Sequence, residues 1–415
     1  MKTLFVNGLL IDGLGGHRER SALLVDDDRI VAVGPDVADR RRDADRVIDL
    51  TGRTLMPGMI DCHAHPGAGD ERTETERDSY GLAAIRTIHA LQRTLWAGIT
   101  TVRNAGTRDF VDVDARDAIA AGLFVGPRLL CAGRAITMTG GHGHKFAVEV
   151  DGPDAIRAEV RRQIKRGVDA IKILASGGIG TPAQSPHHQM FTAEEIAAAV
   201  DEANRYNIPT LTHAMGNQAV RNCIAAGVTS IDHGNYLDEE CCQQMIDRDI
   251  YYVPTFGCYY YYAVRRLADA EKCARTDPVM EPHRQSFQLA MRMGVKIALG
   301  CDCGAPSQMP NGENALEFWL YVQNGMPAER AIVCGTSSSA RLLRIDHLVG
   351  SLESGKLADL VVIDGNPLDD IATLLHGVAL VMKDGRIVRN ELDGKTDLTG
   401  ERSWLAEPLV VPPLD

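Results

Sequence analysis

The chain repeats one local pattern, in which a helical stretch ends at glycine and a short run rich in β-branched residues follows. Glycine just past a helix end supplies the left-handed conformation that caps the helix. A continuous apolar run is typical of a parallel strand that is buried on both faces. Alternation of such strands with helices predicts a parallel α/β fold. The four clearest copies are residues 97–103, 166–172, 226–233 and 293–302.

The predicted strands finish on polar side chains that could bind a ligand. In (β/α)8 barrels the catalytic groups lie at the carboxyl ends of the strands, so the same residues bear on the fold and on the site. The pattern therefore predicts a (β/α)8 TIM barrel over residues 57–354, with its site where the strands end.

Both ends of the chain have a different pattern, in which short apolar strands are separated by turn residues such as Asn7-Gly8 and Asp384-Gly385. This pattern is typical of antiparallel strands joined by tight turns. Residues 1–56 and 355–415 together are predicted to build one small β-sandwich domain. The expected strands include residues 4–6, 22–25, 30–33, 358–363 and 378–382.

The composition excludes several classes of partner. Fifty-six acidic and 44 basic residues give a formal charge of −12, which repels nucleic acid and anionic lipid surfaces. No apolar run approaches the ~20 residues of a membrane span, and residues 1–13 lack the uninterrupted core of a signal peptide. The ten cysteines show no paired CxxC sets. We expect a cytoplasmic protein with neither a nucleic acid nor a membrane partner.

A candidate metal site begins at His63 and His65, which follow the apolar residues 55–60. Residues two apart on a strand point to the same side, so both imidazoles can chelate one ion. A His-x-His pair alone is also compatible with an ordinary polar strand end. Further polar residues strengthen the metal interpretation, because they end later predicted strands in order: Lys172, His213, His233 and Asp302.

The spacing of these residues fits a barrel. Seven steps between His63 and Asp302 would average about 34 residues, close to the ~31 per repeat of a typical barrel. The ligands would then lie on strands 1, 4, 5, 6 and 8. Imidazole and carboxylate suit zinc, manganese, cobalt and iron alike, so the residues do not identify the metal.

With these residues in place, the sequence resembles the amidohydrolase superfamily, in particular its binuclear-metal branch. The resemblance covers the β-domain split between both ends, the segment 57–65, and the Lys, His, His and Asp that follow in order. Within the superfamily, the chain is similar to the metal-dependent Xaa-Pro dipeptidases and carboxypeptidases. The motifs that carry this similarity are residues 139–142, 175–178, 232–235 and 311–314.

The resemblance implies two divalent metal ions, for which we expect zinc. His63, His65 and Asp302 would hold the more buried ion, His213 and His233 the second, and a carboxylated Lys172 would bridge both. A separate argument applies to Lys172, because burial depresses the pKa of an ammonium and a neutral amine can add carbon dioxide. The alternative is a lysine that pairs with a neighbouring carboxylate.

The resemblance also implies a reaction. Two ions lower the pKa of a bridging water toward ~7, and Asp302 could take the proton as hydroxide attacks a carbonyl. The expected small-molecule substrate is a dipeptide or an N-acyl amino acid, cleaved at its amide bond. One alternative is hydrolysis of a non-peptide amide, urea, lactone or cyclic imide. A second alternative is a catalytically silent barrel that serves as an assembly module.

Other residues near the predicted strand ends could contact the substrate. In the similar group, residues matching His142 and Tyr236 contact carboxyl or carbonyl oxygens, whereas turn capping and rim packing are their alternatives. Arg103 could meet a substrate anion or form an ion pair in the barrel mouth. We also expect a homo-oligomer. Residues left outside the predicted site are His144, His187, His188 and the packed tyrosines 259–262.

Overall fold

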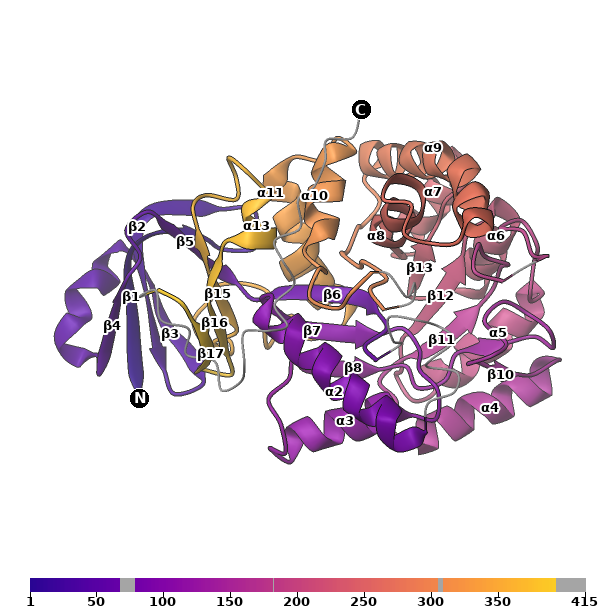
Figure 1. The fold of residues 1–415 in the computed structure, drawn as a ribbon, viewed down its shortest axis with the longest axis horizontal. Helices are drawn as coiled ribbons and strands as arrows, with labels where there is room; N and C mark the ends of the chain where they lie inside the picture. The colour runs from indigo at the N-terminus through magenta and orange to yellow at the C-terminus, as the bar shows by residue number, and fades with distance from the viewer. Residues whose placement is uncertain (68–78, 182, 305–308, 393–415) are drawn as a thin grey trace.

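The computed structural model describes residues 1–67, 79–181, 183–304 and 309–392. Its architecture is mixed α/β, with a sheet built from both ends of the chain beside a region in which strands and helices alternate (Figure 1). The last part of the predicted β-domain, residues 393–415, lies outside the described residues.

Strands from both chain ends form one hydrogen-bonded sheet, in the order β17-β16-β15-β5-β1-β2-β3, with β4 also paired to β1. The antiparallel pairing of β5 with β15 joins the two ends. The structure thus differs from the predicted sandwich, because its strands share one continuous set of hydrogen bonds. The strands are β1 (Lys2–Ile11), β2 (His17–Asp26), β3 (Arg29–Gly34), β4 (Arg46–Asp49), β5 (Arg53–Pro57), β15 (Leu360–Asp364), β16 (Val378–Lys383) and β17 (Arg386–Asn390).

Apolar side chains lie on both faces of this terminal sheet. One cluster joins Phe5, Leu55 and Leu380, which come from three different strands. On the opposite face the 3-10 helix η1 (Pro35–Asp43) contributes Val37 to a cluster with Leu4. The predicted boundaries near residues 56 and 355 fall close to where β5 ends and β15 begins, and they stay a prediction.

The chain leaves the terminal sheet at Gly58, between β5 and β6 (Met59–Ala64). The Gly58 N–H donates to the Asp359 carbonyl at 2.8 Å, and a Cβ at this position would overlap Thr100. Glycine is therefore required here, because the Thr100 side chain leaves no room for a Cβ. The apolar residues 55–60, expected as one continuous run, are divided here between two sheets.

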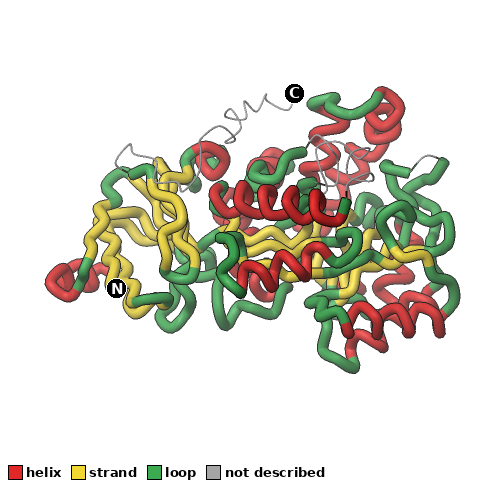
Figure 2. Tube along the Cα trace, turned by 60° about the horizontal axis from the view of Figure 1, so that its bottom comes forward, coloured by secondary structure: helices red, strands yellow, loops and turns green. Residues whose placement is uncertain are grey.

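The alternating region contains two parallel sheets. Strands β6, β7 and β8 form a three-stranded sheet, and a six-stranded sheet has the order β10-β9-β11-β12-β13-β14. Such strands are covered on both faces, and Figure 2 shows helices on both sides of them. The further strands are β7 (Ile99–Asn104), β8 (Arg128–Cys131), β9 (Ile136–Thr137), β10 (Val148–Glu149), β11 (Ile171–Leu174), β12 (Thr210–Ala214), β13 (Ser230–His233) and β14 (Tyr251–Val253).

Backbone hydrogen bonds link the edges of these two sheets. The Ala170 N–H donates to the Cys131 carbonyl at 3.1 Å, which connects β8 with the start of β11. Residues 296–303 lie between β14 and β6, since the Ala298 N–H donates to Tyr252 and the Cys62 N–H to Leu299. These bonds agree with the predicted ring of strands. The described pairings are nevertheless two separate sheets, and the closed eight-stranded barrel stays a prediction.

The predicted glycine helix caps are confirmed, since Gly227 and Gly294 end α6 and α9 with left-handed φ angles. None of the described helices has the length and apolar character needed to cross a membrane. The helices are α2 (Tyr80–Trp96), α3 (Val111–Ala120), α4 (Pro153–Lys165), α5 (Ala193–Asn204), α6 (Asn217–Ala226), α7 (Glu239–Asp247), α8 (Phe256–Tyr259), η2 (Tyr260–Val264), α9 (Ala270–Met293), α10 (Leu316–Gln323), α11 (Ala328–Val333), η3 (Cys334–Ser338), α12 (Ser339–Leu342) and α13 (Thr373–His376).

Candidate metal centre and active site

The six predicted metal ligands are all buried, at or near the carboxyl ends of the parallel strands. Asp302 Oδ1 lies 3.5 Å from His63 Nε2 and 3.3 Å from His65 Nε2. Lys172 Nζ lies 3.5 Å from the same His63 nitrogen. The ring of His233 is 5.0 Å from that of His63 and 4.3 Å from that of His213. The structure therefore brings all six residues together.

The ring of His63 is oriented by a carboxylate. Its Nδ1 lies 2.7 Å from Asp232 Oδ2. Burial, with the nearby positive charge of Lys172, lowers the pKa of His63 to about 4, so the ring is neutral. An ionised carboxylate only accepts hydrogen bonds, so Nδ1 carries the proton. The lone pair of Nε2 then faces Asp302.

The rings of His65 and His233 have the same arrangement. His65 Nδ1 lies 2.8 Å from the Gly106 carbonyl, which can only accept a hydrogen bond. His233 Nδ1 lies 2.7 Å from the Thr255 hydroxyl, whose own proton goes to the Pro254 carbonyl. Both rings therefore carry a proton on Nδ1, and in His233, which burial keeps neutral, Nε2 presents a lone pair.

His213 has the opposite tautomer. Its Nε2 lies 3.3 Å from the Gly177 carbonyl, so this nitrogen donates and Nδ1 carries the lone pair. Burial lowers the pKa values of both His213 and His233 well below the ordinary value, so these rings are also neutral. The tautomer of a metal-binding histidine is usually fixed by such a partner on its other nitrogen.

The resulting donor set fits a cation. The Nε2 atoms of His63 and His65 face Asp302 Oδ1, a buried oxygen without a hydrogen bond from the described residues. His63, His233 and Asp302 offer ligand atoms that all lie within 4.8 Å of one another. Lone pairs this close repel unless a proton or a metal ion lies between them. Nitrogen and carboxylate ligands in this arrangement suit divalent transition metals.

Lys172 is buried beside this donor set. Burial lowers the pKa of Lys172 to about 8, although the negative charges of Asp232 and Asp302 oppose the shift. The nearest of these oxygens, Asp232 Oδ2, is 4.0 Å from Nζ. A substantial fraction of the amine is thus neutral near pH 8, which is the form that can react with carbon dioxide.

Asp232 is a functional residue that the sequence prediction missed. Arg103 is buried, and its guanidinium lies 3.4 Å from Asp232 Oδ2 and donates to the Cys62 carbonyl at 2.6 Å. The ion-pair alternative for Arg103 is therefore the arrangement observed. Burial raises the pKa of Asp232, but Arg103 and the hydrogen bond to His63 outweigh this effect and lower it to about 2. Asp232 is ionised at neutral pH.

Two predicted ligands lie in a strained backbone conformation. His233 has φ 76° and Asp302 has φ 61°, in the left-handed region that non-glycine residues rarely occupy. Such residues cost about 1–3 kcal/mol and cluster at functional sites. At His233 the turn has a direct consequence, because it lets both His233 and the preceding Asp232 face the same site. Strict strand alternation would send them to opposite faces.

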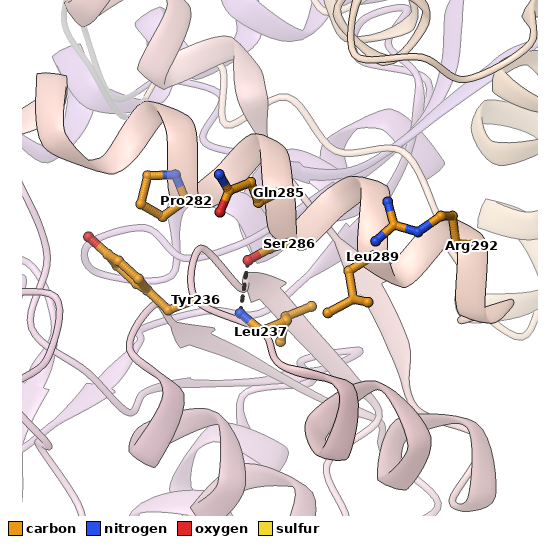
Figure 3. A pocket seen from close by; sticks show the side chains of 7 residues that line it. All are labelled: Tyr236, Leu237, Pro282, Gln285, Ser286, Leu289 and Arg292. Atoms are coloured by element: carbon orange, nitrogen blue, oxygen red, sulfur yellow. Dashed lines mark hydrogen bonds between the residues drawn. The ribbon is translucent and has the colours of Figure 1, made fainter.

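The two predicted substrate contacts occupy different places. The ring of His142 stacks on His213, with centroids 4.4 Å apart. Tyr236 packs against His187, with centroids 4.5 Å apart. It also lines a hollow of about 490 Å³ between α9 and the loop after β13, beside Pro282 (Figure 3). The structure brings His142 onto a predicted ligand and places Tyr236 at this hollow.

Residues left outside the predicted site have structural contacts. His144 Nδ1 lies 3.0 Å from the Gly141 carbonyl, and His188 Nδ1 accepts from the Ser185 N–H. The tyrosines at 259–262 are all buried. Tyr259 also donates to the Asn235 side chain at 3.2 Å, and its ring meets that of His233 edge-on at 6.4 Å.

Histidines, a lysine and a carboxylate lie together at the ends of the parallel strands. This arrangement suits a hydrolytic enzyme. Residues 54–388 match the Amidohydrolase family, and the chain belongs to that family. Ochratoxinase from Aspergillus niger is 30% identical over 424 residues, covering 93% of this chain and 86% of the relative. The predicted family resemblance is confirmed.

Solved structures give the same assignment. A Xaa-Pro dipeptidase with bound methionine in the active site has a TM-score of 0.86 and 35% identity, covering 93% of this chain and 99% of its own. A prolidase complexed with N-methylphosphonate-L-proline has a TM-score of 0.85 and 30% identity, with coverages of 94% and 100%. The chain is therefore a hydrolase that acts on C–N bonds.

We predict that Asp232→Asn weakens metal binding about 10–100-fold, the usual effect of losing the partner of a metal-binding histidine. The free energy of unfolding should also fall by about 3–5 kcal/mol, because Arg103 would be left buried without a negative partner. Metal titration of folded protein and thermal denaturation measure the two effects. Asp364→Asn, which breaks an exposed pair with Arg53, is the control. Unchanged metal affinity in Asp232→Asn would contradict the role of this carboxylate.

Proposed function

We propose that the chain is a binuclear metal-dependent amidohydrolase that cleaves the amide bond of a dipeptide or an N-acyl amino acid. The observation that carries the proposal is the convergence of the His63 and His65 Nε2 atoms on the Asp302 carboxylate. His63, His65 and Asp302 would hold one ion, and His213 and His233 the other. A carboxylated Lys172 would join them.

Two divalent ions, zinc in this proposal, would supply an activated water and polarise the scissile carbonyl. Asp302 would act as general base and then as general acid. Burial raises its pKa, but the adjacent His65 and the positive charge of Lys172 lower it by more, so the carboxylate is ionised at neutral pH, the form that would accept a proton. It would pass that proton to the departing amine.

The chain's own residues would also orient the substrate. His142, stacked on His213, is close enough to the site to donate to a substrate carbonyl. Tyr236, at the hollow beside α9, would contact a terminal carboxylate. The names of the Xaa-Pro dipeptidase and the prolidase support a dipeptide substrate. We also propose a cytoplasmic homo-oligomer, the state expected from the sequence.

A non-peptide amide, urea, lactone or cyclic imide is the second candidate substrate. Ochratoxinase, with its 30% identity, carries the name of a substrate other than a dipeptide, so the names of the relatives do not limit the substrate to dipeptides. The assembly-module alternative has no support, because the chain is a hydrolase by family.

A substrate library tests the proposed function. We expect the metal-loaded protein to release amine from dipeptides or N-acyl amino acids, measured with ninhydrin. Ureas, lactones and cyclic imides form the comparison set, and protein treated with a chelator is the control. Turnover of the comparison set alone would replace the proposed substrate class with the alternative.

For Lys172→Ala we predict loss of most activity and a fall from close to two bound ions per chain to one or fewer. Short carboxylic acids should restore part of both, because they can occupy the space of the carbamate. Lys172→Arg should not restore either, since a guanidinium stays cationic. Elemental analysis and turnover are the measurements. Lys296→Ala removes an exposed lysine paired with Asp249 and serves as control. Near-normal turnover in Lys172→Ala would exclude a bridging role.

Asp302→Asn should reduce turnover by about 10²–10⁴, the usual contribution of general acid–base catalysis. The amide keeps the shape of the side chain and one coordinating oxygen, so metal content should fall far less. Turnover and metal stoichiometry are measured on the same preparation. Full activity would remove the catalytic assignment, and equal loss of metal and activity would reduce Asp302 to a ligand.

A further inference from the structure

The ring of His142 is fixed by a residue from a different loop. His142 Nδ1 lies 2.9 Å from the Thr181 hydroxyl oxygen. The same oxygen accepts the Gly143 N–H at 3.4 Å. These contacts connect the loop after β9 with the loop after β11, directly above the predicted ligand His213.

The hydrogen bonds determine where the protons lie. A threonine hydroxyl has one proton to donate and lone pairs to accept with. Among the described residues, the Thr181 hydroxyl contacts the Gly143 N–H, which can only donate, and His142 Nδ1, so Nδ1 is the acceptor available to the hydroxyl proton. A neutral imidazole that accepts at Nδ1 carries its proton on Nε2. The donor nitrogen of His142 is therefore Nε2.

Two other contacts hold this arrangement in place. Gly178 lies against the ring, and a Cβ at this position would come 2.5 Å from His142 Cε1, so a larger residue would displace the imidazole. Arg275, on α9, donates through Nη1 to the Thr181 carbonyl at 3.1 Å. The Thr181 backbone is thus attached to a long helix rather than held by its loop alone.

We propose that Thr181 is a positioning residue for the reaction, because its hydroxyl fixes His142 as an Nε2–H donor to the substrate carbonyl oxygen. The proposal rests on the proposed function, in which His142 contacts that oxygen. Negative charge develops on a carbonyl oxygen as a nucleophile adds to it, and a donor fixed in advance stabilises that charge without reorganisation. Thr181 would act only through His142.

Nitrogen NMR of zinc-loaded protein labelled with ¹⁵N-histidine tests the tautomer without reference to activity. The chain has 13 histidines, and His142→Asn identifies the His142 signals by their loss. We expect a protonated Nε2 and an unprotonated Nδ1 in the wild-type protein, a changed proton distribution in Thr181→Val, and the wild-type pattern in Thr181→Ser. A protonated Nδ1 in the wild-type protein, or unchanged His142 signals in Thr181→Val, would overturn the proposal.

Kinetics test the consequence for catalysis. With a dipeptide that the wild-type protein cleaves, Thr181→Val should lower kcat about tenfold or more, a fraction of the 10²–10³ lost with a whole oxyanion donor. KM and metal content should change less than twofold, and Thr181→Ser should recover most of kcat. Thr51→Val is the matched control, because it removes an exposed hydroxyl bonded to Asp49 in the terminal sheet. An unchanged kcat in Thr181→Val would overturn the positioning role.

The two proposals can fail separately. If the wild-type protein cleaves no dipeptide or N-acyl amino acid, the proposed function fails, whereas the NMR experiment still decides the tautomer. If the wild-type protein is active and Thr181→Val matches it, only the role of Thr181 fails. Gly178→Ala gives a second variant, since its Cβ should disturb the same His142 signals and lower kcat in the same direction.

Discussion

The candidate site depends on a property of neutral imidazole, which has one donor and one acceptor. Whichever nitrogen is bound by an outside acceptor takes the proton, and the other then presents its lone pair to the site. In His63 the outside acceptor is the Asp232 carboxylate, and in His65 it is the Gly106 carbonyl. Backbone and side-chain acceptors near the ends of the parallel strands therefore determine which nitrogen of each predicted ligand faces the site.

The need to fix the proton of each imidazole also explains the buried charged groups next to His63. Asp232 must remain ionised to hold the His63 tautomer, and a lone carboxylate in an apolar interior would tend to take up a proton. Arg103 supplies the opposing charge at 3.4 Å. Among the described residues, the anion nearest to Lys172 Nζ is Asp232 Oδ2 at 4.0 Å, and this carboxylate is already paired with Arg103. An amine in that position has a lowered pKa and is open to carboxylation.

The sequence indicated which residues the structure brings together at the candidate site, because their pattern is local. His63 and His65 share a strand face, and the other ligands follow apolar runs that end at one edge of a parallel fold. Asp232 was not found this way, because strict alternation with an inward His233 would point Asp232 outward, whereas the left-handed backbone at His233 lets both side chains face the site. The continuous terminal sheet was also missed, since a strand pattern indicates which residues form strands but not which strands pair with each other. The need for glycine at position 58 depends on Thr100, which is distant in sequence.

Substrate selection has a different physical basis from metal binding. The ligands are carried by strands or by residues bonded directly to them, whose positions are set by many backbone hydrogen bonds. His142 and Thr181 lie in loops, and their relative position depends on a few contacts, including the one from Arg275. Relatives can therefore keep the same strand-end ligands while loop changes alter which carbonyl is presented to them. Because of this difference between strand residues and loop residues, the sequence indicates the family and the reaction class more directly than the substrate.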